Sequence, residues 1–141
     1  MITTLTAITS FLGTGRFLAG FLRDPHHTHG PPDFYIDKYR VISTRTNMAV
    51  WDYKSVLAHE LGHAHPRDRR SGNKYFDDRQ EKRADEYAAH LLICPPPHRL
   101  RHLAPWHGHD HSGLAIDLEV TPKLLETYMK MYPNALKGLV A

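Results

Sequence analysis

The spacing of apolar residues changes along this chain and marks out its predicted helices and strands. Near the start, Leu5, Ile8 and Leu12 recur at helical intervals, so a helix is predicted within residues 1–22. The stretch FYIDKYRVISTRT at 34–46 is rich in aromatic and β-branched residues and predicts two short strands or one bent strand. No other stretch carries a comparable strand signal.

Helical spacing returns from about Asp52 and stops before Pro66. A polar stretch separates this helix from a second one, which is predicted from about Arg79 to Ile93 and is ended by the prolines at 95–97. The apolar stripe of the second helix comprises Ala84, Tyr87, Ala88, Leu91 and Leu92.

The C-terminal part of the chain predicts further helices. After a loop rich in histidine and proline, the stretch LAIDLEVTPKLLETYMKMYP at 114–133 predicts two helices that meet near Glu119 and Val120. Thr121 is suited to the N-cap of the second of these helices, and Pro122 to its first position.

The composition is that of one soluble globular domain. With 141 residues, of which 41% are hydrophobic and 23% charged, we predict a single domain over residues 1–141. The net charge of +3 is small and the cations are spread along the chain, so direct binding to nucleic acid is not expected. The one cysteine, Cys94, allows no internal disulfide, which favours a cytosolic location. Gly13, Gly15 and Arg16 interrupt the apolar N-terminal stretch, so neither a signal peptide nor a membrane helix is expected.

The first of the two central helices carries a pattern typical of metal sites. His59, Glu60 and His63 form H-E-x-x-H, a motif short enough to need support from its surroundings in a chain with 12 histidines. Side chains at i and i+4 share one face of a helix, so both imidazoles can point at one metal ion. Leu57 and Leu61 fall on the opposite side and are expected to anchor this helix in the core.

Glu60 is expected to act as the general base. It lies about 100° around the helix from His59, where its carboxylate can reach a water on the metal without binding the metal itself. A catalytic zinc site usually has three protein ligands, and the second helix offers Glu81 as the third ligand and Asp85 as acceptor of a ligand histidine's ring N–H. Two alternatives remain: Glu86 as the third ligand, or an acidic face that is merely solvated and paired with neighbouring cations.

Several other polar residues are given no role in the metal site. His65 is turned about 200° from His63 and is expected at the surface. The histidines within 26–29 and 107–111 are expected in flexible loops, the second of them near the cleft. Cys94 is expected to be buried rather than nucleophilic. By chemistry alone, the candidates for stabilising an oxyanion are Tyr39, Tyr75 and His90.

Two helical motifs, LAHELGHA at 57–64 and ExxADxYAAxLL at 81–92, occur together, with RVI at 40–42 before them and LAIDLEVTPKLLETYMKMY at 114–132 after them. With these segments the chain resembles the ImmA/IrrE family of zinc metallopeptidases, in its short form, which is best known beside the repressors of prophages and other mobile elements. The resemblance covers a core of about residues 35–132, and the pairing of the first two motifs is specific. The regulatory domain of larger members and the histidine-rich segment after the second helix lie outside the shared pattern.

The resemblance implies an α+β, zincin-like fold, in which a small β-sheet packs against two metal-bearing helices and a helical C-terminal tail follows. It also implies Zn²⁺ as the cofactor, although the same ligand types accept other divalent metals. The implied site comprises His59, His63 and Glu81 as zinc ligands, Glu60 as catalytic base and Asp85 as partner of a ligand histidine.

The predicted function is a zinc-dependent endopeptidase that cleaves a DNA-binding transcriptional repressor in the cytoplasm of a bacterial host. One alternative is a non-catalytic zinc-containing module that inactivates a repressor by contact, but such a module would not need Glu60 as a base. The other alternative is a small helix-turn-helix protein that uses the tail helices to bind DNA. The second tail helix offers only Lys123 and Lys130 as cations, which favours packing against the peptidase core.

Overall fold

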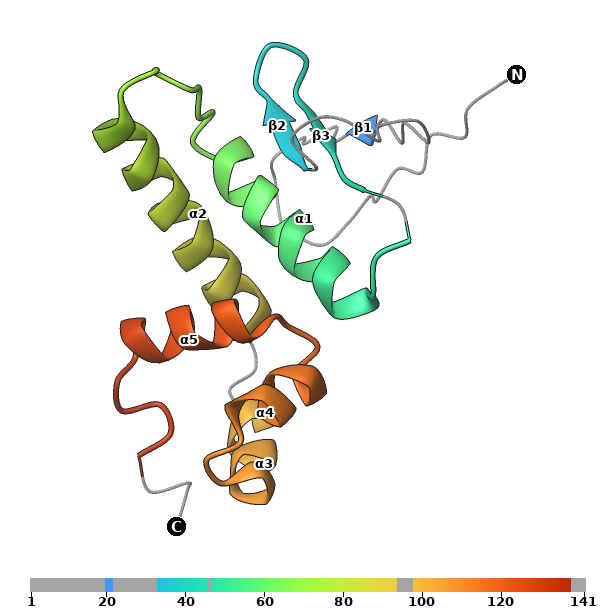
Figure 1. The fold of residues 1–141 in the computed structure, drawn as a ribbon, viewed down its shortest axis with the longest axis vertical. Helices are drawn as coiled ribbons and strands as arrows, with labels where there is room; N and C mark the ends of the chain where they lie inside the picture. The colour runs from blue at the N-terminus through green and yellow to red at the C-terminus, as the bar shows by residue number, and fades with distance from the viewer. Residues whose placement is uncertain (1–19, 22–32, 46, 94–97, 138–141) are drawn as a thin grey trace.

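The computed structural model of the chain describes residues 20–21, 33–45, 47–93 and 98–137, which form a small sheet and a set of helices. Figure 1 shows the sheet beside α1, with α2 along the other side of that helix and the remaining helices grouped towards the C-terminus. The elements are β1 (Gly20–Phe21), β2 (Phe34–Ile36), β3 (Val41–Ser43), α1 (Val50–Ala64), α2 (Lys74–Ile93), α3 (His98–His107), α4 (His111–Asp117) and α5 (Pro122–Met131). The predicted α+β class is confirmed.

The predicted strand stretch forms a hairpin. β2 and β3 run antiparallel, and a tight turn joins Ile36 to Val41. β1 pairs in parallel with the other edge of β3, which gives the strand order β1-β3-β2. Gly20–Phe21, near the end of the stretch 1–22 in which a helix is predicted, form β1, and the residues that carry the predicted helical spacing lie outside the described residues. A strand this short has no periodicity of its own, so only its pairing with β3 reveals it.

α1 and α2 contain the two predicted central helices, and both begin earlier than predicted. α1 starts at Val50, close to the predicted Asp52, whereas α2 starts at Lys74. The Oδ1 atom of Asn73 accepts the backbone N–H of Tyr75 at 3.0 Å, which satisfies one of the free donors at the start of α2. The first turns of α2 are charged and carry no apolar stripe, so periodicity could not place this start.

The C-terminal part of the chain is more helical than predicted. α3 occupies a stretch predicted as a loop, because Leu100 and Ala104, four residues apart, are both buried in the core. α4 and α5 are the two predicted tail helices. The Oγ1 atom of Thr121 accepts the N–H of Leu124, and Pro122 is the first residue of α5, so the predicted cap is confirmed.

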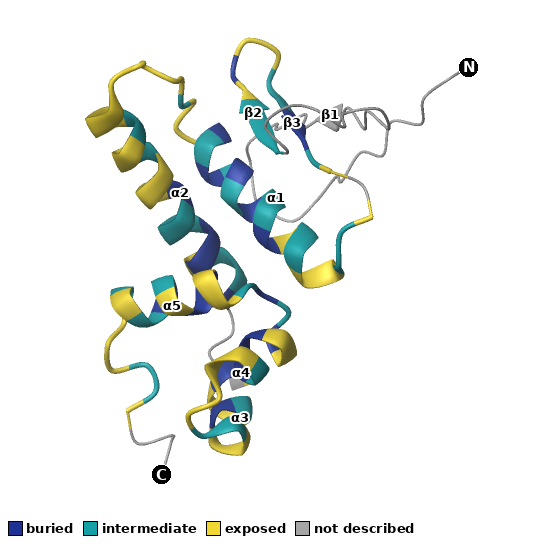
Figure 2. Ribbon diagram, viewed as in Figure 1, coloured by how far each residue is buried: buried dark blue, intermediate teal, exposed yellow. Residues whose placement is uncertain are grey.

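α1 and α2 lie close together because small residues meet where the helices pack. A Cβ atom added to Gly62 would lie 2.8 Å from the Cα atom and 2.9 Å from the carbonyl oxygen of Ala84. Leu57 and Leu61, which were expected to anchor α1, are partly buried and lie outside the main core cluster, to which α1 contributes Ala58. Figure 2 shows the buried positions along both helices. The small buried residues of α1 and α2 include Ala58, Gly62, Ala84 and Ala88.

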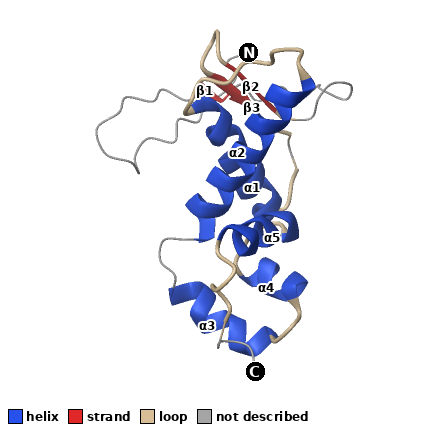
Figure 3. Ribbon diagram, turned by 90° about the vertical axis from the view of Figure 1, so that its left-hand side faces the viewer, coloured by secondary structure: helices blue, strands red, loops and turns tan. Residues whose placement is uncertain are grey.

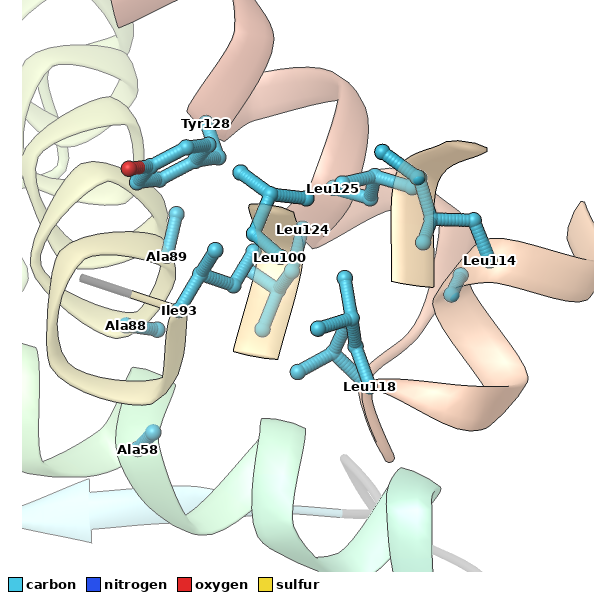
Figure 4. Close-up of a cluster of buried hydrophobic side chains, with 13 residues drawn as sticks. Ala58, Ala88, Ala89, Ile93, Leu100, Leu114, Leu118, Leu124, Leu125 and Tyr128 are labelled. Carbon is cyan, nitrogen blue, oxygen red and sulfur yellow. The ribbon is translucent and has the colours of Figure 1, made fainter. Parts of the chain in front are cut away.

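The main core lies among α2, α3, α4 and α5, and Figure 4 shows its side chains. α5 contributes Leu124, Leu125 and Tyr128, all buried, and Leu114 reaches the same cluster from α4. Figure 3 shows the sheet and α3 at opposite ends of the molecule, with α1 and α2 between them. None of the helices among the described residues has the length and apolar character needed to cross a bilayer.

We expect Gly62→Ala to lower the free energy of unfolding by about 1–3 kcal/mol, the usual cost of overpacking a close contact. Alanine is the better helix former by about 1 kcal/mol, but the clash with the backbone of Ala84 outweighs that gain. Urea unfolding followed by circular dichroism measures the change. Ser112→Ala, at an exposed position of α4, is the control and should stay within about 0.5 kcal/mol. A higher midpoint for Gly62→Ala would show that the helices do not approach this closely.

Candidate metal centre

Two imidazoles and a carboxylate converge where α1 packs against α2. His59 and His63 lie on one face of α1, with their Nε2 atoms 3.1 Å apart. Glu81 of α2 faces both: its Oε2 atom lies 3.3 Å from Nε2 of His59, and its Oε1 atom lies 3.6 Å from Nε2 of His63. These ligand atoms all lie within 4.8 Å of one another, a spacing that could hold one metal ion.

A carboxylate contacts the far ring nitrogen of each histidine. Oδ1 of Asp85 lies 2.8 Å from Nδ1 of His59, and Oδ2 of Asp68 lies 3.0 Å from Nδ1 of His63. These contacts favour a proton on each Nδ1, which leaves the two Nε2 lone pairs facing each other. Lone pairs at that separation repel unless a cation or a proton lies between them, so this set of donors fits a metal ion.

The two carboxylates behind the histidines are each paired with a cation. Lys123 of α5 lies 2.7 Å from Oδ2 of Asp85, and Arg83 of α2 forms an ion pair with Asp68. Burial acts to raise the pKa of Asp85, but the hydrogen bonds from His59 and Lys123 outweigh burial and hold that pKa below its ordinary value. Asp85 is therefore ionised at neutral pH and remains an acceptor for the histidine.

Asp68, which lies in the loop after α1, was not among the site residues predicted from the sequence. Its backbone N–H donates to the carbonyl oxygen of His63 at 2.9 Å, and this turn brings its side chain back to the imidazole of the same residue. The only signal in the sequence was an acidic residue soon after the motif. Three arginines within the same loop made that residue look like part of a solvated, mixed-charge segment.

Glu60 lies beside the histidine pair and is 6% exposed. Burial raises the pKa of its carboxyl group, although the neighbouring His59 and His63 act in the opposite direction. For His59, burial acts to lower the pKa, but Asp85 and nearby carboxylates outweigh burial and raise it. A carboxylate with a raised pKa binds protons more readily, which suits a group that accepts and returns one.

A cleft of about 820 Å³ runs between the β2–β3 hairpin, α1 and α2, and Glu60 is part of its wall. Tyr35 of β2 also lines it; its hydroxyl donates to Oδ1 of Asp37 at 3.0 Å and accepts from Arg40 at 2.8 Å. Arg40 also donates to the carbonyl oxygen of Ala64 at 3.0 Å. These bonds fasten the hairpin to the end of α1, and they were not visible in the sequence.

The other acidic and aromatic candidates do not join the site. Glu86 faces Lys82, whose Nζ atom lies 3.7 Å from its Oε1 atom, so the structure does not favour Glu86 as the third ligand. The three residues predicted as candidates for stabilising an oxyanion are not among the described residues that line the cleft. They are Tyr39, Tyr75 and His90.

The additional histidines lie away from the cleft or outside the described residues. His65 is exposed, as predicted, and its ring centroid lies 5.9 Å from that of Tyr87. The segment 107–111 joins α3 to α4, at the opposite end of the molecule from the sheet (Figure 3), so its predicted place near the cleft is wrong. Cys94 and the histidines within 26–29 lie outside the described residues.

Comparison with known proteins identifies a family for most of the chain. The family described as IrrE N-terminal-like domain, a peptidase family, matches residues 21–128. Neither the curated proteins nor the solved structures gave a significant match. The matched residues include the hairpin, α1 and α2, and so all the side chains that converge at the candidate centre. Because the match covers most of its length, the chain belongs to the IrrE N-terminal-like family of metallopeptidases.

Proposed function

We propose that this chain is a zinc-dependent endopeptidase in which His59, His63 and Glu81 bind the metal and Glu60 is the catalytic base. The observation that carries this proposal is the pair of Nε2 atoms that face Glu81 while a carboxylate contacts the other nitrogen of each ring. Two histidines and one glutamate are the protein ligands of several hydrolytic zinc sites, which keep a fourth position open. A purely structural site has no need of a buried base beside it.

Held by His59, His63 and Glu81, a zinc ion would supply Lewis acidity, which would polarise the scissile carbonyl and make a water at the site more acidic. The carboxylate of Glu60 accepts a proton from the water whose oxygen attacks the carbonyl carbon, and later delivers that proton to the nitrogen of the amine as the C–N bond breaks. Asp85 and Asp68 hold the imidazoles with their Nε2 atoms towards the cleft. The cleft keeps the substrate segment beside Glu60 while the proton moves.

The proposed substrate is a DNA-binding transcriptional repressor of a prophage or another mobile element, in the cytoplasm of a bacterial host cell. Family membership supports this choice, because the ImmA/IrrE proteins that the sequence resembles are best known as proteins that occur together with repressors of prophages and other mobile elements. The burial of Glu60 favours cleavage over inactivation by contact alone.

The packing of the tail does not favour the DNA-binding alternative. Leu124, Leu125 and Tyr128 of α5 are buried in the core, and Lys123, one of the two cations of this helix, is paired with Asp85. A recognition helix has to present polar and cationic side chains to a groove. The exposed face of α5 has few cations to offer.

We expect purified protein to contain about one zinc per chain and Glu81→Gln to lose most of it, because two histidines alone leave the site one protein ligand short. Elemental analysis after purification without added metal measures this. Glu86→Gln is the matched control, since it removes a carboxylate from the same helix outside the cluster, and it should keep its zinc. Full zinc retention in Glu81→Gln would mean that another residue is the third ligand.

Asp68→Asn and Asp85→Asn should each weaken zinc binding by about 10- to 100-fold, because the amide no longer holds the imidazole as strongly. Competition with a fluorescent zinc chelator gives the affinities. Asp117→Asn is the control, because its side chain makes an equivalent contact, 2.9 Å, with His107 outside the cluster. If Asp68→Asn binds zinc as tightly as the unmodified protein, Asp68 does not orient His63.

Glu60→Gln should retain zinc and lose about 100-fold or more of its peptidase activity, because the proton acceptor is gone. Mass spectrometry of protein N-termini in host cells that produce either form identifies the substrate. A new N-terminus within a DNA-binding repressor is expected only with intact Glu60. Identical sets of N-termini from both forms would contradict the proposed endopeptidase function.

A further inference from the structure

The exposed charges around the cleft are almost all positive. Four cations line it, one from the turn of the β2–β3 hairpin and three from the loop between α1 and α2. They are Lys38, Arg67, Arg69 and Arg70, all exposed. The carboxylates of the cleft are largely buried, except for Glu81, the proposed metal ligand. The side chains of Asp33, Asp37 and Asp68 are 10%, 3% and 8% exposed.

The buried carboxylates already have partners within the protein. Asp33 pairs with Arg45 at 3.1 Å, and Asp68 contacts His63 and Arg83. They are therefore unavailable to balance charge on a substrate, and they do little to offset the cations at the surface of the cleft.

Asp37 holds two of the cations at the rim without neutralising both. Its Oδ1 atom accepts from Nε of Arg67 at 2.9 Å, and its Oδ2 atom accepts from Nε of Arg69 at 2.7 Å. These two hydrogen bonds hold the pKa of Asp37 well below its usual range, so the carboxyl group is ionised. The side chains of Arg67 and Arg69 remain 62% and 74% exposed. One carboxylate thus holds two exposed arginine side chains in place and leaves a net positive charge.

Lys38 and Arg70 extend this positive surface. Among the described residues, neither is hydrogen-bonded to a carboxylate or within ion-pair distance of one. The Nζ atom of Lys38 lies 5.1 Å from the ring centroid of Tyr39. Arg70 lowers the pKa of Asp77 only through longer-range electrostatics. Their charges are available to a bound molecule.

We propose that this basic rim, formed by Lys38, Arg67, Arg69 and Arg70, selects substrate segments rich in aspartate and glutamate. The proposal rests on the proposed endopeptidase function and names the chemistry of the segment that enters the site. An acidic polypeptide fits better than nucleic acid, because the cations line the same cleft as Glu60 and the metal cluster, where a polypeptide has to lie to be cut. Complementary charge steers such a segment into the cleft and discriminates against basic ones.

The test measures binding rather than cleavage, in the zinc-loaded Glu60→Gln protein. Fluorescence anisotropy compares a labelled, alanine-rich peptide that contains four glutamates with the same peptide carrying glutamines instead. The rim variant combines Lys38→Gln with Arg70→Gln. The matched control combines Arg101→Gln with Lys137→Gln, which removes two exposed cations from α3 and from the segment after α5.

We expect the glutamate peptide to bind about tenfold more tightly than the glutamine peptide. The rim variant should bind the glutamate peptide about fivefold more weakly than the protein with an intact rim, as expected for a few exposed charge pairs acting together. The control variant should change the affinity by less than about twofold, because its cations do not line the cleft and charges beyond the first contacts are screened by physiological salt.

Equal affinities for the two peptides, or an equal loss in the rim and control variants, would overturn the proposal, since binding would then not depend on the rim. The proposal would also be overturned if duplex DNA displaced the glutamate peptide and if binding of that DNA depended on Lys38 and Arg70, because the rim would then bind nucleic acid. Binding needs no hydrolysis, so its failure leaves the peptidase proposal standing. Conversely, unchanged protein N-termini would refute cleavage without affecting the binding result.

Discussion

Gly62 and Ala84 meet backbone to backbone where α1 packs against α2, and the candidate metal centre is built around this contact. Gly62 is next to His63 in α1, and Ala84 lies between Glu81 and Asp85 along α2. The absence of a side chain on Gly62 allows the polar face of α2 to come within hydrogen-bonding distance of the imidazoles. A larger residue at this point would separate the carboxylates from the histidines, whatever their spacing in the sequence.

Cations from outside the motif support the two histidines. Lys123 contacts Asp85, which contacts His59, and Arg83 contacts Asp68, which contacts His63. Buried polar groups cost free energy when a partner is missing, and among the described residues no buried side-chain nitrogen or oxygen lacks one. α5 therefore has two roles: it supplies one of these cations, Lys123, and its apolar face packs against α2.

The wall of the cleft depends on a second polar cluster. Asp37 accepts hydrogen bonds from Tyr35 in the hairpin and from Arg67 and Arg69 in the loop after α1. Arg40 joins the same hairpin to the carbonyl oxygen of Ala64. The ion pairs that hold two loops together thus also determine the charge that a substrate meets, so stability and recognition share the same residues at this edge of the molecule.

Local periodicity was enough to predict much of the fold and the proposed metal ligands. The i, i+4 spacings of the histidines in α1 and of Glu81 and Asp85 in α2 are properties of single helices, as is the cap at Thr121. Tertiary structure alone decided that β1 is a strand, that α3 is a helix, and that Asp68 reaches His63. Their conformations and contacts depend on partners distant in the sequence or on the path of a loop, and neither leaves a periodic signal in the chain. The sequence by itself therefore determined which residues share a helix face, because helix geometry is set by neighbours along the chain. Packing decided which faces meet, because contact between helices depends on the shape and size of side chains across the core.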